Sequence, residues 1–162
     1  MAKILFLSNG HGEDLSGALI GSAFKKLGHE VNALPLVGNG ESYSKAGIRV
    51  LGKTKSFSTG GMGYTSLKGR IVELIQGQII YLIKRICFLF MIVSKYDLLV
   101  VVGDVLPVTI AWLTQLPVVT YLVAYSSHYE GKIKLPWPCS NCLSNERFLK
   151  IYTRDRLTAN DL

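Results

Sequence analysis

The sequence is poor in cysteine and proline, and each shortage excludes a class of protein. Its 162 residues include three cysteines, an odd number that argues against a secreted disulfide framework, so we expect a reducing, cytoplasmic location. The 5 prolines and 16 glycines follow no fixed period, which excludes collagen-like chains. With 49% apolar and 18% charged residues, the chain has the composition of one folded domain spanning residues 1–162.

Uninterrupted apolar runs and acidic residues are scarce as well. The stretch 105–129 is long enough to span a bilayer, but Pro107 and Pro117 divide it, so we expect no transmembrane helix. The 11 acidic residues face 18 Lys and Arg, which gives a net charge of +7. Most of the excess lies in the apolar segment 53–95, which suits an anionic membrane surface better than nucleic acid. The expected membrane-surface residues are Lys68, Arg70, Lys84 and Arg85.

Strand and helix patterns alternate along the chain. Helical periodicity covers residues 13–27, 68–94 and 105–115. Short apolar runs predict strands at residues 3–8, 31–37, 48–51, 98–102, 118–123 and 148–152. This order predicts an α/β fold, namely a doubly wound, Rossmann-like parallel sheet with helices on both faces.

Two turns follow strands at the edge where such sheets bind ligands. The first is Asn9-Gly10-His11-Gly12, and the second is Gly103-Asp104. Asp104 could carry a raised pKa and act as a general base, or it could only cap the next helix. His11 could polarise or deprotonate a hydroxyl across the same cleft, or it could only hydrogen-bond its own loop.

Three further motifs are less specific. Ser126, Ser127, His128, Tyr129 and Glu130 follow a strand, so they are either ligand-edge residues or a polar surface loop. Residues 47–54 match the expression GxxxxGK[ST], but their variable positions look like a strand, which would reject a P-loop phosphotransferase. The Cys139-x-x-Cys142 pair has no second pair, so we expect no metal site.

Several of these motifs together resemble the N-terminal half of GT-B glycosyltransferases, and most of all the lipid-A-disaccharide synthase-related proteins of oxygenic phototrophs. The matching stretches are SNGHGEDL at residues 8–15, STGGMG at 58–63, Gly103-Asp104, residues 121–129, and YTRDRL at 152–157. The resemblance implies one half of a GT-B fold, the half that binds the acceptor. We expect the chain to lack the domain that holds the nucleotide-diphosphate sugar donor, and to be inactive unless a further domain or partner chain supplies it.

The chemistry that the resemblance implies is inverting transfer without a metal or cofactor. A base removes a proton from the acceptor hydroxyl as this attacks the anomeric carbon; Asp104 aligns with the proposed base, and His11 is the other candidate. The acceptor is expected to be lipid-like, with the protein peripheral on the inner face of a membrane. The expected substrate-binding residues are Asn9, Gly10, Gly12, Glu13, Gly60, Gly61, Ser126, Ser127 and Tyr129.

Two alternatives stay open at this point. The chain could be a non-catalytic membrane-surface binding module, which needs neither Asp104 nor His11. It could also be a nucleotide-sugar epimerase-like domain, although the cleft would then need more acids and histidines than the sequence offers.

Overall fold

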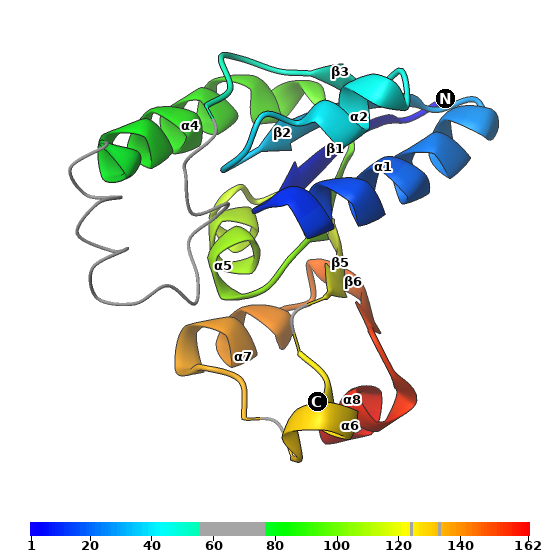
Figure 1. Ribbon diagram of the computed structural model, residues 1–162, viewed down its shortest axis with the longest axis vertical. Coiled ribbons are helices and arrows are strands. Elements are labelled where there is room, and N and C mark those ends of the chain that lie inside the picture. Colours follow the sequence, from blue (N-terminus) through cyan, green and yellow to red (C-terminus); the bar gives the residue numbers. More distant parts are fainter. Residues whose placement is uncertain (56–76, 124, 133) are drawn as a thin grey trace.

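The fold is a parallel sheet with helices on both faces. The computed structural model describes residues 1–55, 77–123, 125–132 and 134–162. Within them, six strands pair in the order β3-β2-β1-β4-β5-β6 (Figure 1). This doubly wound, Rossmann-like arrangement confirms the predicted fold class. The strands are β1 (Lys3–Ser8), β2 (Glu30–Pro35), β3 (Arg49–Val50), β4 (Leu98–Val102), β5 (Val118–Leu122) and β6 (Phe148–Thr153).

Helices pack on each face of the sheet because the crossovers go in two directions from β1. One face carries α1 (His11–Lys26) and α2 (Glu41–Lys45), and the other carries the helices that precede β4, β5 and β6. These are α4 (Gln78–Ile92), which the short 3-10 helix η1 (Val93–Lys95) extends, α5 (Val105–Leu113) and α7 (Trp137–Leu143). Two short helices, α6 (Ser127–Glu130) and α8 (Arg156–Asp161), lie against each other beyond the carboxyl ends of β5 and β6.

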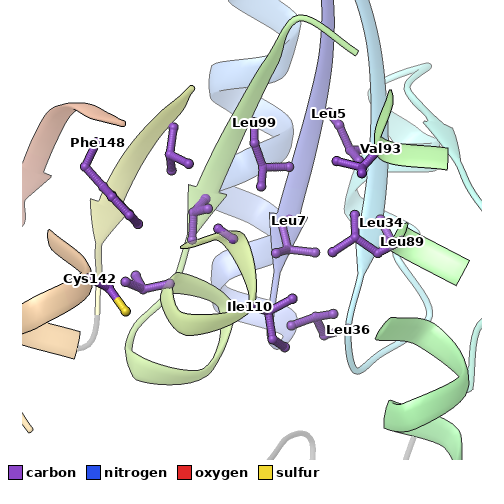
Figure 2. Packing of buried hydrophobic residues seen from close by; sticks show 14 of the residues in the cluster. Leu5, Leu7, Leu34, Leu36, Leu89, Val93, Leu99, Ile110, Cys142 and Phe148 are labelled. Atoms are coloured by element: carbon purple, nitrogen blue, oxygen red, sulfur yellow. The ribbon is translucent and has the colours of Figure 1, made fainter. Parts of the chain in front are cut away.

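Two hydrophobic clusters, one on each face, explain why the central strands are apolar throughout. Leu5 and Leu7 of β1 point into the cluster under α4, α5 and α7, whereas Ile4 and Phe6 point into the cluster under α1 and α2. Figure 2 shows the first cluster, in which Leu99 of β4 lies beside the two leucines. Side chains alternate between the faces of a strand, so covering both faces requires apolar residues at every position.

The described elements agree closely with the sequence predictions. The strands expected at residues 3–8 and 98–102 have these bounds, and α1 and α5 differ from the expected ranges by two residues at most at either end. The helix expected over 68–94 is described from Gln78 onward, and residues 68–76 lie outside the described part. The sequence patterns did not predict α2, α6 and α7, which are too short to show a clear period.

Arg85 contradicts the expectation that it faces a membrane. The side chain is 3% exposed, and its Nε and Nη2 donate to the Pro35 carbonyl at 3.0 and 2.6 Å. Its Nη1 donates to the Leu51 carbonyl at 2.7 Å. Both carbonyls lie just beyond the regular pairing of β2 and β3, so the guanidinium satisfies oxygens that the sheet leaves free. Lys84, in contrast, is exposed as expected.

Replacing Arg85 by Met should therefore destabilise the fold. Arg85→Met keeps the aliphatic stem but leaves the Pro35 and Leu51 carbonyls without their donor, which should cost about 2–4 kcal/mol of unfolding free energy. Urea denaturation measures this cost. The neighbouring Lys84→Met should change the unfolding free energy by no more than about 0.5 kcal/mol, because Lys84 is a surface residue. Equal effects of the two substitutions would contradict the structural role of Arg85.

Candidate functional site

The two turns that the sequence singled out lie side by side. The neighbouring strands β1 and β4 are parallel, and Ser8 pairs with Val102, so Asn9 and Gly103 leave the sheet at the same level. Gly103 has a φ of +151°, and a Cβ there would lie 2.7 Å from Cγ of Pro107 and 3.9 Å from Cγ of Glu13. Glycine at this position thus allows the start of α1 to approach the start of α5. The two turns thus flank the position, where β1 and β4 diverge, at which doubly wound sheets usually have their ligand crevice.

Asp104 lies at the N-cap position of α5, yet its carboxylate does not cap the helix. Its backbone carbonyl accepts from the N–H of Val108 at 3.1 Å, whereas its side chain makes no capping hydrogen bond. Burial raises the pKa of Asp104, and the nearby backbone N–H groups, including those of Leu106 and Val105, act in the opposite direction. A half-buried carboxylate whose pKa is raised despite these N–H groups is well suited to accept a proton.

The first turn offers hydrogen-bonding groups that the fold does not use. Asn9 is only 9% exposed, and its side-chain oxygen has no partner among the described residues. The helix α1 begins at His11 without a side-chain cap, and a Cβ on Gly12 would meet no atom within 4 Å. Free N–H groups at a helix start favour negative charge and ligand oxygens. His11 is exposed at this position, and Glu13 is half-buried beside Gly103.

A buried network below the first turn was missed by the sequence analysis. Asp14 is 1% exposed, and its Oδ1 accepts from Oγ of Ser8 at 2.6 Å. Oγ of Ser8 in turn accepts from the hydroxyl of Tyr43 at 3.1 Å. The other carboxylate oxygen of Asp14 is buried without a partner in the described part of the chain. Burial raises the pKa of Asp14 to about 6, and the Ser8 hydroxyl and His11 oppose this shift.

The hydroxyls of Ser126 and Ser127 are engaged with the end of the chain. Oγ of Ser126 donates to Oδ2 of Asp155 at 2.7 Å, and Oγ of Ser127 donates to Oδ2 of Asp161 at 2.7 Å. These bonds hold α8 beside α6. The two serines thus have a structural role in a surface segment, which is one of the two alternatives that the sequence left open. Tyr129 is 76% exposed, and the guanidinium of Arg154 lies 5.7 Å from its ring centroid.

The remaining candidate residues and motifs either lie outside the described residues or do not contribute to this site. Gly60, Gly61, Lys68 and Arg70 lie outside the described residues. The GxxxxGK[ST] match is not a P-loop, because its centre is the strand Arg49–Val50. Cys139 and Cys142 are free, buried thiols, and burial raises the pKa of Cys139 to about 12. Among the residues that the structure describes, no group of three His, Cys, Asp or Glu could hold a metal ion.

Asp14 should make stability depend on pH in a direction opposite to that of most carboxylates. Its folded pKa of about 6 exceeds the ordinary value of 3.8, so the folded state binds the proton more tightly than the unfolded state. The stabilisation by this proton is complete below about pH 4 and is lost as the pH rises through 6. At pH 7 the charged, buried carboxylate should cost about 3 kcal/mol.

Asp14→Asn tests this expectation because the amide oxygen can still accept from Ser8. The difference in unfolding free energy between Asp14→Asn and the parent should shift in favour of the variant by about 3 kcal/mol between pH 4 and pH 7. Urea denaturation at several pH values measures this difference. The adjacent Glu13→Gln serves as a control and should show no such shift. A difference that does not change with pH would refute the raised pKa.

Comparisons with known proteins find similarity in fold alone. No family model matches the sequence, and no curated protein matches it. The glycosyltransferase SsfS6 of Streptomyces sp. SF2575 aligns at a TM-score of 0.46 and 16% identity, covering 74% of this chain and 39% of that one. The calicheamicin glycosyltransferase CalG4 aligns at a TM-score of 0.47 and 18% identity, covering 80% of this chain and 35% of that one.

A third solved structure has a different chemistry. A putative NADPH:quinone reductase from Bacillus thuringiensis aligns at a TM-score of 0.45 and 12% identity, covering 99% of this chain and 39% of that one. This chain thus spans less than half the length of each of the three proteins. Because a fold does not by itself determine function, the function has to be argued from the site.

Proposed function

We propose that the chain is the acceptor-binding domain of an inverting glycosyltransferase. The observation that carries the proposal is that the Asn9 turn and Asp104, a half-buried carboxylate whose pKa is raised by burial, leave the sheet side by side from the parallel strands β1 and β4. Crevices between the strands from which the two directions of a doubly wound sheet depart are its usual ligand sites. The motifs that resemble GT-B glycosyltransferases include both of these turns.

In this proposal Asp104 removes the proton from an acceptor hydroxyl. The hydroxyl oxygen attacks the anomeric carbon of the donor sugar, the bond from this carbon to the nucleotide diphosphate breaks, and the diphosphate leaves with the electron pair. The proton stays on Asp104, whose raised pKa makes the carboxylate a stronger base than an exposed aspartate. His11 on the facing turn is the other candidate for this role. Neither step requires a metal or a cofactor.

The acceptor would be held by the first turn. The unpartnered oxygen of Asn9 can accept a hydrogen bond from an acceptor hydroxyl, and the free N–H groups at the start of α1 can donate to acceptor oxygens. Gly12 leaves the space above them open. The nucleotide-diphosphate sugar would be bound by a second Rossmann-like domain or a partner chain, so we expect no turnover from residues 1–162 alone.

A second part of the proposal concerns an anionic membrane surface. No helix in the described ranges is long and apolar enough to cross a membrane. However, α4 exposes one apolar face, whose large side chains are between 43% and 67% exposed. The whole chain carries a net charge of +7, which makes it complementary to anionic lipid, and Lys84 is exposed on α4. The α4 apolar face consists of Ile79, Ile80, Ile83, Phe90 and Met91.

Asp104→Asn should abolish glycosyl transfer while leaving the fold intact. Loss of a general base typically lowers kcat by about 10²–10⁴-fold, and the amide has nearly the same shape as the carboxylate. The assay requires the chain joined to its nucleotide-sugar domain, with radiolabelled donor sugars and a membrane lipid extract as acceptor. His11→Gln, measured alongside, identifies which of the two groups is the base.

The control for this experiment is Glu146→Gln, which removes an exposed carboxylate that precedes β6 and so lies at the opposite edge of the sheet. It should retain the parent kcat, and circular dichroism should show that every variant is folded. If Asp104→Asn and His11→Gln both turn over at the parent rate, neither residue is the base and the proposed mechanism is wrong.

The α4 apolar face should bind anionic vesicles. Ile83→Glu combined with Met91→Glu places two charges on this face, so the affinity for vesicles containing phosphatidylglycerol should fall by at least about 10-fold in a co-sedimentation assay. The parent should bind phosphatidylcholine vesicles more weakly, and added salt should release it. The control is Leu19→Glu on α1, since Leu19 is similarly exposed but lies on the other side of the sheet. An equal loss in this control would refute docking through α4.

A further inference from the structure

A small cavity lined by polar side chains lies at the same edge of the sheet as Asp104, one to two strands further along. It has a volume of about 170 Å³ and is formed by the segments that follow β5 and β6. Neither the proposed base nor the Asn9 turn contributes to it. The residues that line this cavity are Ser126, His128, Tyr129, Arg154 and Asp155.

The oxygen atoms of the cavity are already used by the fold. Oδ1 of Asp155 accepts from the backbone N–H and the hydroxyl of Thr158 at 2.8 and 2.9 Å. Its Oδ2 accepts from Oγ of Ser126 at 2.7 Å. These bonds, first of all the one from Ser126, lower the pKa of Asp155. Asp155 is therefore an ionised, fully bonded part of the wall that caps α8, rather than a free acceptor for a ligand.

The unused groups of the cavity are hydrogen-bond donors. The Arg154 side chain is exposed, and among the side chains that the structure describes, which do not include that of Glu130, no carboxylate forms an ion pair with its guanidinium. The ring of Tyr129 lies 5.7 Å from this guanidinium and restricts its orientation by a cation–π contact. The His128 ring packs edge-on against Tyr129 at 5.0 Å, with an interplanar angle of 84°. One aromatic ring thus brings an arginine and a histidine together.

The charges around the cavity leave room for an anion. Arg154 and the bonded Asp155 carry opposite charges, Glu130 follows Tyr129 in the sequence, and the carboxylate of Asp161 is bound to Oγ of Ser127. Arg156 follows on α8, and two exposed lysines, Lys132 and Lys134, follow α6. Phosphate oxygens accept bidentate hydrogen bonds from a planar guanidinium, so they match the exposed Arg154, whose orientation the Tyr129 ring restricts.

We propose that Arg154, His128 and Tyr129 form a phosphate-binding subsite. In the proposed function this phosphate would belong to the glycosyl acceptor, so the biological role of the subsite rests on that function. The cavity follows β5 and β6, which are one and two positions from β4 in the sheet, and so opens at the same edge as Asp104. An acceptor whose sugar hydroxyl lies at Asp104 would then extend along this edge to place its phosphoryl group at Arg154. Inorganic phosphate would bind through the same chemistry.

The subsite can be tested on residues 1–162 without any turnover. Two-dimensional NMR titrations with inorganic phosphate, glucose 1-phosphate and glucose, at constant ionic strength, should perturb residues 126–129 and 153–156 with the two phosphates and not with glucose. Arg154→Gln should weaken phosphate binding by at least about 10-fold. The matched control, Arg156→Gln, removes the same charge two residues further on and should leave the affinity within twofold of the parent.

Further variants keep the test decisive if Arg154→Gln proves unstable. Arg154→Lys keeps the charge without the planar fork and should bind phosphate more weakly than the parent, as should Tyr129→Leu, which removes the ring that orients Arg154. Tighter binding of glucose 1-phosphate than of inorganic phosphate would identify a phosphorylated sugar as the ligand, and equal binding would identify the phosphate group alone.

Three results would overturn the subsite. These are parent-like binding by Arg154→Gln, an equal loss in Arg156→Gln, and perturbations scattered over the basic surface. Because the titration does not involve Asp104, its failure leaves the proposed transferase mechanism standing. Conversely, a parent-like kcat of Asp104→Asn leaves the phosphate subsite standing.

Discussion

The parallel pairing of β1 with β4 is the constraint on which the candidate site depends. From β1 the chain crosses to β2 in one direction, whereas β4 opens the series that runs in the other direction, so the helices that follow β1 and β4 lie on opposite faces. The two turns at their carboxyl ends are thereby adjacent. Gly103 completes this arrangement, since any side chain there would collide with Pro107. The order of the strands therefore determines where the site lies, and the side chains determine only its chemistry.

Much of the fold could be predicted from the sequence because the relevant signals are local. The run LLVVV in β4 is apolar because both faces of the strand are covered, and the turns at Asn9 and Asp104 follow strands that short apolar runs identify. Arg85 could not be assigned in this way. Its carbonyl partners at Pro35 and Leu51 lie 50 and 34 residues away in sequence, so only the folded chain shows that this cation is a buried donor.

The same limitation applies to the polar networks of the site. Asp14 fits the pattern of an acidic residue in the first turn of a helix, which predicts a solvated charge near the helix dipole. Its burial against Ser8 and Tyr43 depends on how α2 packs beside α1, and α2 has no clear periodicity. Arg154 and Tyr129 are similarly joined only because β5 and β6 are neighbours in the sheet. Spacing along the chain identifies chemically active residue types but not their partners.

The proposed membrane surface and the crevice are compatible in their placement. In a parallel sheet the crossover helices run antiparallel to the strands, so the first turn of α4 lies toward the carboxyl edge, where the crevice opens. The α4 apolar face extends from Ile79 to Met91, which at 1.5 Å per residue is about 18 Å along the helix. A helix lying in the membrane interface along this face would bring its first turn, and the carboxyl edge of the sheet beside it, to the lipid headgroups. A lipid-linked acceptor could then approach the two turns from the bilayer, whereas the proposed Arg154 subsite, which follows β5 and β6, lies at the other end of the sheet from α4 and so faces away from that surface.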